Sequence, residues 1–283
     1  MAGPVPAMTM WLSDGTKNVD ARDIGERSDA VLQTATPGHD DVAERAEFSI
    51  DDQPRRTTRV GQDIKLTASD NFQLGAYRAD PSGSPKGAVV VIQEIFGVNH
   101  HIRSVCDRLA GEGYVAIAPS IFDRTSPNFQ SGYTPDEIAE ARKFVASPDW
   151  EAMLRDTQAA IDAVKSVGPV GIIGFCLGGS VAFVAATRLT GLKAAIGYYG
   201  GAVVRFADET PKVPTQLHFG EKDSGIPLTD VETVKAKRPD VEVFIYPGAQ
   251  HGFHCDERPS YDKASADIAW PRSMDFFAKH LTK

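Results

Sequence analysis

The stretch Val170-Gly-Ile-Ile-Gly-Phe-Cys-Leu-Gly-Gly179 decides the fold. Its first half, Val170–Gly174, is a short apolar run, which is typical of a strand buried on both faces of a parallel sheet. The apolar segment Leu177–Leu189 follows at once and predicts a helix. Cys176 therefore occupies a strand-to-helix turn so tight that glycines must flank it. This pattern predicts that its thiol projects from the carboxyl end of a sheet, at a helix N-terminus whose dipole favours the thiolate.

The sequence on both sides of this stretch alternates strand patterns with helix patterns. Apolar and polar residues alternate over Ile64–Leu66 and Phe72–Tyr77, as in half-buried antiparallel strands. Further strands are predicted over Gly87–Gln93, Tyr114–Ala118, Ala194–Tyr199, Thr215–Phe219 and Val241–Tyr246, and helices over Ile102–Leu109, Pro135–Ala146, Trp150–Val167, Asp230–Lys237 and Tyr261–His280. Strands that alternate with helices predict the α/β class, with a mostly parallel sheet covered by helices on both faces.

One domain, expected over residues 59–283, accounts for this alternation. Residues 1–58 differ from it, because they are rich in Ala, Asp, Pro, Gly and Arg and contain few large apolar residues. We expect them to form an N-terminal extension that is partly irregular. A lid over the site and a contact between subunits are the alternatives for this extension.

Composition narrows the function classes. The chain has 283 residues and a formal net charge of −8, which argues against nucleic acid or an anionic membrane as a partner. Its three cysteines form no CxxC pair and fit a reducing compartment. No apolar run approaches a membrane span, and neither a secretory nor a twin-arginine signal fits the N-terminal sequence. A cytoplasmic protein, monomeric or a small homo-oligomer, is therefore expected.

Two polar residues come shortly after predicted strands that follow Cys176 in the sequence. Asp223 comes after the strand Thr215–Phe219, and His251 comes after the strand Val241–Tyr246. Both strand ends lie at the edge of the sheet where Cys176 emerges, and the order nucleophile, acid, histidine is that of α/β-hydrolases. The sequence therefore predicts a Cys–His–Asp triad, in which His251 is the base and Asp223 orients it.

Four segments resemble one known family. They are Gln93–Asn99 (QEIFGVN), Gly174–Gly179 (GFCLGG), Gly197–Gly200 (GYYG) and Gly248–Phe253 (GAQHGF). Together they are similar to the dienelactone hydrolases, whose type activity is that of carboxymethylenebutenolidase, and the resemblance extends from about Ile64 to Leu281. It implies an α/β-hydrolase fold, a cysteine nucleophile, a small ester or lactone substrate and no cofactor.

The resemblance also implies roles for residues around Cys176. In this family a carboxylate at the position of Glu94 keeps the resting thiol protonated and accepts its proton when substrate binds. The backbone N–H of Leu177, next to the nucleophile, is expected to form one half of an oxyanion hole. By the resemblance, the N–H of Ile95 forms the other half.

The expected substrate site departs from the family pattern. Family enzymes bind the carboxylate of dienelactone with two arginines, but the matching positions here are Cys255 and Ile138, and the serine that follows the family's histidine is Gly252. Arg124, Arg142 and Arg258 are the candidate replacements. Tyr198 and Phe253 are expected to line the pocket.

Two alternatives to a dienelactone hydrolase remain open at this point. One is a carboxylesterase for small esters or thioesters, which the missing arginines favour. The other is a non-catalytic redox sensor that uses the Cys176 thiol, although a sensor does not need an oriented base. No metal is expected, because the spacing of His251, His254 and Cys255 fits no structural zinc pattern. His100 and His101 are expected at a solvated helix start, or else in the pocket lining.

Overall fold

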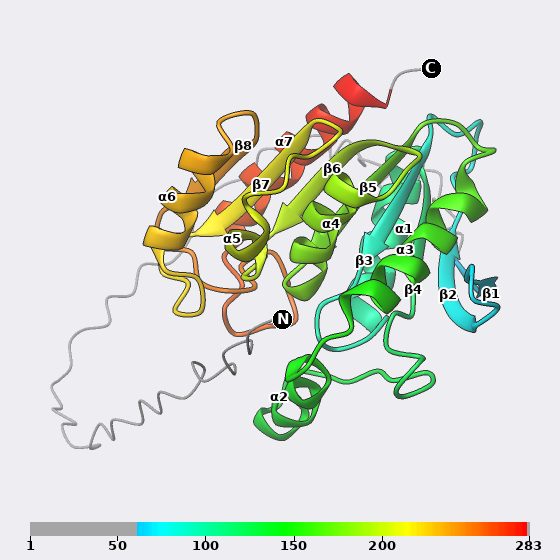
Figure 1. Cartoon of the computed structure of the whole chain (residues 1–283), viewed down its shortest axis with the longest axis horizontal. Coiled ribbons are helices and arrows are strands. Elements are labelled where there is room, and N and C mark those ends of the chain that lie inside the picture. Colours follow the sequence, from blue (N-terminus) through cyan, green and yellow to red (C-terminus); the bar gives the residue numbers. More distant parts are fainter. Residues whose placement is uncertain (1–60, 282–283) are drawn as a thin grey trace, which may run out of the picture. The chain divides into compact units, whose positions relative to one another are not determined.

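The computed structural model describes residues 61–281, so the expected extension over residues 1–58 lies outside the described residues. The strands are β1 (Gln62–Thr67), β2 (Gln73–Ala79), β3 (Ala88–Ile92), β4 (Val115–Pro119), β5 (Val170–Phe175), β6 (Leu192–Tyr198), β7 (Thr215–Gly220) and β8 (Glu242–Tyr246). They form one eight-stranded sheet in the order β1-β2-β4-β3-β5-β6-β7-β8 (Figure 1). The strand β2 is antiparallel to both of its neighbours, and the remaining pairs are parallel.

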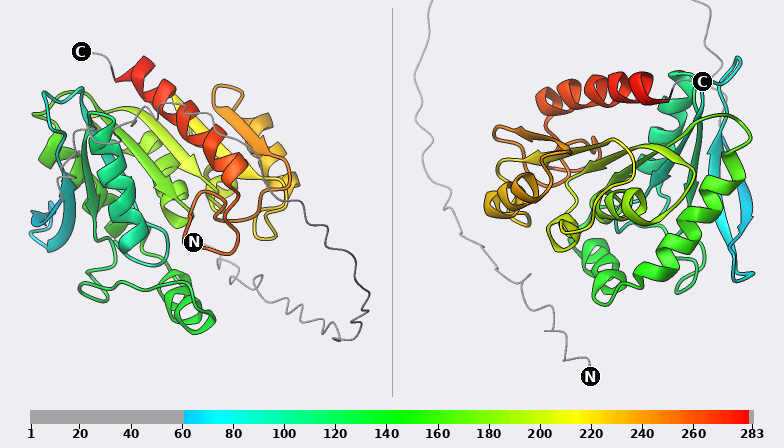
Figure 2. Two further views of the ribbon diagram at one scale, coloured as in Figure 1. Left: turned by 180° about the vertical axis from the view of Figure 1, so that it is seen from behind. Right: turned by 45° about the horizontal axis from the view of Figure 1, so that its top comes forward.

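The helices are α1 (His100–Gly111), α2 (Pro135–Arg142), α3 (Trp150–Val164), α4 (Leu177–Arg188), α5 (Val203–Phe206), α6 (Leu228–Lys237) and α7 (Lys263–His280), with a 3-10 turn, η1, over Lys143–Val145. Helices α3 and α4 lie on the face of the sheet that is nearer the viewer in Figure 1. Helices α1 and α7 cover the opposite face, as the view from behind in Figure 2 shows. The predicted architecture, a mostly parallel sheet covered on both faces, is confirmed.

The burial of the strands follows from these two layers of helices. Every residue of β3, β4 and β5 is buried, which explains why these strands read as continuous apolar runs. In contrast, β1 exposes most of its residues and alternates along its length. Because β3 and β5–β8 run in one direction, their carboxyl ends meet at a single edge of the sheet. The loops that leave this edge carry the residues singled out in the sequence.

The observed element ends differ from the predicted ones where caps and turns intervene. The helix predicted over Pro135–Ala146 is regular only to Arg142, and the turn η1 follows it. The C-terminal helix begins at Lys263, because the side chain of Asp262 accepts a hydrogen bond from the N–H of Ser265 and caps it. The single-turn helix α5 was not predicted, since four residues carry no periodic signal.

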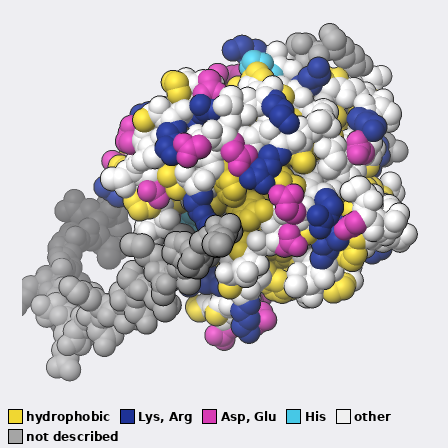
Figure 3. All heavy atoms as spheres, viewed as in Figure 1, with side chains coloured by type: hydrophobic (Ala, Val, Ile, Leu, Met, Phe, Trp, Pro, Cys, Tyr) yellow, Lys and Arg dark blue, Asp and Glu magenta, His cyan; other side chains and the backbone are white. Residues whose placement is uncertain are grey.

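The surface is of mixed charge. Figure 3 shows basic and acidic side chains interspersed over the face that it presents. Within residues 61–281, no helix combines the length and the apolar character that crossing a bilayer requires.

Candidate active site

The turn at Cys176 has the strained geometry that its sequence predicts. Cys176 has φ 54° and ψ −115°, a backbone conformation that is rare for any residue other than glycine. Its N–H donates to the carbonyl of Tyr198 at 3.0 Å, and its own carbonyl accepts from Gly179 at 3.0 Å. The helix α4 starts at the next residue, Leu177. The thiol is thus held between the end of β5 and the start of α4.

Two glycines allow this turn to form. A Cβ atom at Gly174 would lie 1.9 Å from the carbonyl oxygen of Gly178. A Cβ atom at Gly178 would lie 2.3 Å from the carbonyl oxygen of Ile92, at the end of β3. No side chain fits at such distances, because the backbones of β3, β5 and α4 are in direct contact there. The Gly-x-Cys-x-Gly pattern is therefore a packing requirement of the turn.

His251 connects Cys176 to Asp223. Its Nε2 atom lies 3.2 Å from Sγ of Cys176, and its Nδ1 atom lies 2.7 Å from Oδ2 of Asp223. The side chain of Asp223 is fully buried, and that of His251 is 25% exposed. Burial by itself lowers the pKa of His251, but the charges and hydrogen bonds of Cys176 and Asp223 outweigh it and raise this pKa to about 10. The imidazole can thus hold a proton at neutral pH.

Glu94 lies in the same site but is held by other partners than expected. The described residues provide no hydrogen bond between Glu94 and Cys176. Instead, Oε1 of Glu94 accepts from Nη1 of Arg258 at 3.1 Å, and Oε2 accepts from the hydroxyl of Tyr133 at 3.4 Å. Glu94 is 1% exposed, so Arg258 neutralises a carboxylate that would otherwise be buried alone. In this arrangement the thiol faces His251.

The two backbone groups expected to bind an oxyanion both lie at the carboxyl edge of the sheet. Leu177 is the first residue of α4, where N–H groups have no intrahelical acceptor. Ile95 follows Glu94 at the carboxyl end of β3. Within residues 61–281, neither N–H has a hydrogen-bond acceptor. Both donors are thus available to a ligand, as an oxyanion hole requires.

The predicted pocket residue Tyr198 faces α7, whereas its neighbour Tyr199 contacts the candidate triad. The hydroxyl of Tyr198 is 2.7 Å from Oγ of Ser273 on α7, and its ring stacks on His218. Tyr199 packs against His251 instead, with ring centroids 5.1 Å apart. Its buried hydroxyl has no hydrogen-bond partner among the described residues. Burial and the charge of Glu94 raise the pKa of Tyr199 well above its usual value, so its hydroxyl stays protonated.

Phe253 also differs from its expected role. It is fully buried and packs against Tyr198, Tyr199 and Tyr246. It therefore belongs to the core beneath the site, where it supports the loop that carries His251.

The three candidate arginines lie in different surroundings. Arg124 is held by two carboxylates, because Nη2 lies 2.7 Å from Oδ1 of Asp156 and Nη1 lies 2.8 Å from Oδ2 of Asp70. Arg142 is exposed at the end of α2, a helix that lies beyond the main body of the sheet in Figure 1. Only Arg258 contacts Glu94. The structure places Arg124 in an ion pair with Asp156 and Asp70 and shows no contact between it and the candidate triad.

Arg124 is accordingly expected to matter for stability. Asp156 is fully buried, and burial raises its pKa against the opposing effect of Arg124. We expect the Arg124→Gln variant to lose about 2–4 kcal/mol of unfolding free energy, because it leaves a buried carboxylate unpaired. The measurement is urea denaturation, with Arg142→Gln as the exposed control, which should change the stability by less than about 0.5 kcal/mol. Equal stability of the two variants would contradict this role.

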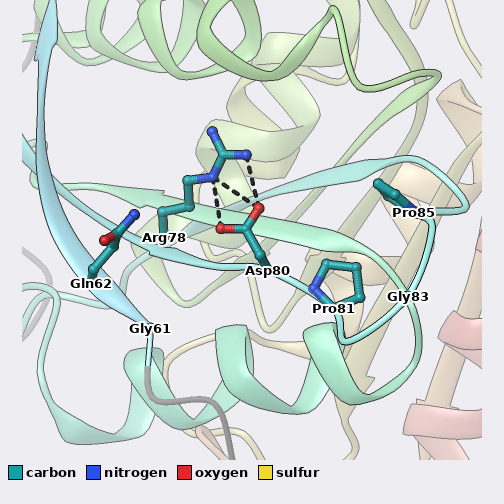
Figure 4. A pocket seen from close by; sticks show the side chains of 7 residues that line it. All are labelled: Gly61, Gln62, Arg78, Asp80, Pro81, Gly83 and Pro85. Atoms are coloured by element: carbon teal, nitrogen blue, oxygen red, sulfur yellow. Dashed lines mark hydrogen bonds and ion pairs between the residues drawn. The ribbon is translucent and has the colours of Figure 1, made fainter.

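A surface pocket lies far from Cys176 and the rest of the candidate site. It is lined by Gly61, Gln62, Arg78, Asp80, Pro81, Gly83 and Pro85 (Figure 4). Arg78 and Asp80 pair across it, with Nη2 and Oδ1 2.8 Å apart. The end of β2 at Ala79 pairs with Ala116 at the start of β4, so this pocket lies at the edge of the sheet opposite Cys176. It takes no part in the candidate site.

The sequence missed two residues that the fold brings to Glu94 and His251. Tyr133 immediately precedes the capped N-terminus of α2, and no motif distinguishes it from a loop tyrosine. Tyr199 adjoins Tyr198 in the sequence, and no pattern there favours one tyrosine over the other. Only the contacts of the folded chain reveal either residue.

The strand order and the turn at Cys176 together define an α/β-hydrolase. The dienelactone hydrolase family model matches residues 74–281, and the chain belongs to that family. A Synechocystis protein named "Putative carboxymethylenebutenolidase" is 38% identical over 243 residues, which cover 77% of this chain and 98% of that protein. The carboxymethylenebutenolidase of Pseudomonas putida is 30% identical, over 78% of this chain and 97% of that enzyme.

Solved structures agree with this assignment. The crystal structure described as a putative dienelactone hydrolase from Klebsiella pneumoniae superposes with a TM-score of 0.69 at 30% identity, and covers 78% of this chain and 99% of that one. The family and these relatives identify the chain as a hydrolase that acts on ester or lactone bonds.

Proposed function

We propose that the protein hydrolyses an enol-lactone of the dienelactone type through a Cys176–His251–Asp223 triad. The observation that carries this proposal is the position of His251, which is within hydrogen-bond distance of both Sγ of Cys176 and Oδ2 of Asp223. An imidazole oriented by a carboxylate and in contact with a thiol at a strand-to-helix turn is the arrangement that nucleophilic acyl transfer requires.

The proposed reaction has two stages. The Cys176 thiolate attacks the lactone carbonyl, and the N–H groups of Leu177 and Ile95 stabilise the tetrahedral oxyanion. The C–O bond of the ring then breaks, and the departing enolate oxygen takes a proton from Nε2 of His251. In the second stage His251 accepts a proton from water, which attacks the thioester and releases the acid and the thiolate. Asp223 holds the imidazole in the required orientation throughout.

Arg258 is the arginine that we propose for the substrate's carboxylate. Its guanidinium lies directly over Gly252, because a Cβ atom there would be 2.5 Å from Nη1 of Arg258. A serine at that position, as in the type member of the family, would require the guanidinium to shift. The absence of a side chain at Gly252 thus compensates for the replacement of the family's arginine by Cys255. A substrate carboxylate would compete with Glu94 for the same guanidinium and release Glu94 toward the thiol.

The second candidate function is hydrolysis of small neutral esters. The observation in its favour is that the Arg258 guanidinium is already paired with Glu94 at 3.1 Å. A substrate without a carboxylate would leave that pair intact. The two candidates share the triad and differ only in the role of Arg258.

The experiment that separates them compares Arg258→Gln with the wild-type protein on dienelactone and on an uncharged aryl ester. If Arg258 binds the carboxylate, kcat/KM for dienelactone should fall about 30- to 100-fold, because a charge-assisted hydrogen bond is lost. The uncharged ester should be affected less than about threefold. Arg142→Gln is the matched control and should leave both substrates unchanged.

Equal losses on both substrates would show that Arg258 acts on Glu94 alone and would favour the neutral-ester function. If the wild-type protein hydrolyses the ester but not dienelactone, the dienelactone proposal fails and the triad proposal stands.

A further inference from the structure

Three buried side chains next to the triad form a cluster that the proposed reaction does not fully use. They are Glu94 after β3, His101 in the first turn of α1 and Cys255 in the loop before α7. One carboxylate oxygen, one imidazole nitrogen and the thiol sulfur lie within 4.8 Å of one another. The three residues are 1%, 3% and 0% exposed. His101 is therefore not part of a solvated helix start, whereas His100 is exposed and pairs with Glu257.

His101 has a nitrogen that the described residues leave without a partner. Its Nδ1 atom faces Oδ1 of Asp256 at 3.7 Å. Its Nε2 atom is buried and has no hydrogen-bond partner within residues 61–281. A buried nitrogen of this kind is uncommon, because its loss of water is not compensated. The Nε2 atom can therefore take a metal ion as its partner, while the carboxylate of Asp256 lies near the other ring nitrogen but beyond hydrogen-bond distance.

The donor set suits one class of ion in particular. Zn²⁺ combines imidazole, thiolate and carboxylate ligands at about 2.0–2.3 Å in tetrahedral geometry, which places the ligand atoms roughly 3.3–3.8 Å apart. The present separations, within 4.8 Å, exceed this by on the order of 1 Å, so the three side chains must move closer by that amount when the ion binds. Three protein ligands would leave the fourth position open.

A surface pocket reaches one member of this cluster, His101. It is lined by His101, Ser104, Val105, Arg108, His254, Asp256, Tyr261, Ala266 and Asp267. Asp256 is mostly exposed, with 70% of its side chain accessible. An ion can therefore approach His101 from the α1 side of the sheet.

Occupation of the cluster would disturb the triad's surroundings. Glu94 is bound by Arg258 and Tyr133, and Tyr133 also accepts a hydrogen bond from the Cys255 thiol at 3.3 Å. A cation bound to Glu94 and Cys255 would replace both partners, and the guanidinium of Arg258 would be left beside a second positive charge. This repulsion keeps the affinity moderate and makes binding reversible.

We propose that Glu94, His101 and Cys255 form a Zn²⁺ site whose occupation withdraws Glu94 and inhibits turnover. The Cys255 thiol releases its proton to solvent as the zinc–sulfur bond forms, and no oxidation occurs. The inhibition rests on the proposed hydrolytic function, whereas the binding site does not.

The binding test uses the full chain in a Cys176→Ala background, because the Cys176–His251 pair could itself bind zinc. Zn²⁺ binding is measured by calorimetry, and Co²⁺ serves as a spectroscopic probe. We expect one site per chain, with a sulfur-to-cobalt charge-transfer band. Adding Cys255→Ser or His101→Asn should weaken Zn²⁺ binding at least tenfold. Adding Cys106→Ser, which removes a buried thiol outside the cluster, should not.

Loss of all zinc binding in the Cys176→Ala protein would overturn the proposal, because the metal would then belong to the triad. Unchanged binding in both the Cys255→Ser and His101→Asn proteins, each checked for a native melting transition, would overturn it as well. Two variants on different elements guard against the misfolding of either one.

The inhibition test uses wild-type protein and His101→Asn with an uncharged aryl ester. We expect Zn²⁺ to inhibit the wild-type protein reversibly, with activity restored by a chelator. The His101→Asn variant should need at least tenfold more Zn²⁺ for the same inhibition. Equal inhibition of both proteins would overturn the regulatory role. If the wild-type protein hydrolyses no ester or lactone, the proposed function fails, while the binding test still decides the zinc site.

Discussion

The Cys176→Ala variant is expected to hydrolyse its lactone or ester at least about 10⁴-fold more slowly than the wild-type protein, while keeping its fold. The reason is that alanine removes the nucleophile and leaves only substrate binding and the oxyanion donors. The measurement is turnover at saturating substrate, followed by ultraviolet absorbance. Cys106→Ala is the matched control, because Cys106 is buried in α1 away from the site. Comparable losses in both variants would contradict the assignment of the nucleophile.

His251 should control the reactivity of the same thiol. Because Cys176 and Asp223 raise the pKa of His251 to about 10, the imidazole beside Cys176 stays protonated until the pH rises through that value. Alkylation of Cys176 by iodoacetamide should therefore vary less than about threefold between about pH 6 and 8. In the His251→Ala variant the rate should climb about tenfold per pH unit, as for an isolated thiol.

A steep pH dependence in the wild-type protein would show that the imidazolium–thiolate pair does not form. A redox sensor would respond to peroxide through Cys176 in both the wild-type protein and His251→Ala, and it would show no turnover for the substitution to remove. Loss of turnover with a preserved oxidation response would still support the hydrolase, because only turnover needs an oriented base.

The second large effect is expected from a single methyl group at the turn. In the Gly174→Ala variant, Cβ would lie 1.9 Å from the carbonyl oxygen of Gly178. Because the obstructing atom belongs to the backbone of α4, β5 and α4 must separate to make room. We expect a loss of about 3 kcal/mol or more in the free energy of unfolding, together with a large loss of turnover.

Gly83→Ala is the control for this substitution, because a Cβ atom there meets no atom within 4 Å. It should change the stability by less than about 1 kcal/mol. The measurement for both variants is urea denaturation followed by circular dichroism. A Gly174→Ala protein within about 1 kcal/mol of wild type would show that the turn can relax, and that Gly174 is not a packing requirement.

The sequence predicted the α/β architecture well, because a strand that is buried on both faces of a sheet is almost entirely apolar. The apolar runs that become β3, β4 and β5 needed no partner to be recognised as buried strands. The sequence also predicted that Asp223 and His251 lie near Cys176, since each follows a strand and parallel strands bring their carboxyl ends to one edge of the sheet. The hydrogen bonds of His251 to Cys176 and Asp223 agree with that expectation.

The sequence could not predict which of two adjacent buried tyrosines contacts the candidate site. Tyr198 is the last residue of β6, whereas Tyr199 lies just beyond the strand with φ 39°, so the alternation of side chains along a strand does not determine where Tyr199 points. Both faces are covered by helices here, so composition cannot distinguish them. The contact of Tyr199 with His251 and of Tyr198 with Ser273 became visible only in the fold.

What the sequence alone determined is the set of groups at the carboxyl edge of the sheet, because strand order and local turn chemistry fix which residues end there. Tertiary structure alone decided the partners of those groups. Arg124 pairs with Asp156, and Arg258 pairs with Glu94, although nothing in the sequence distinguished the two arginines. The physical reason is that ion pairing falls off with distance in space, and the folded chain sets that distance between residues far apart in sequence.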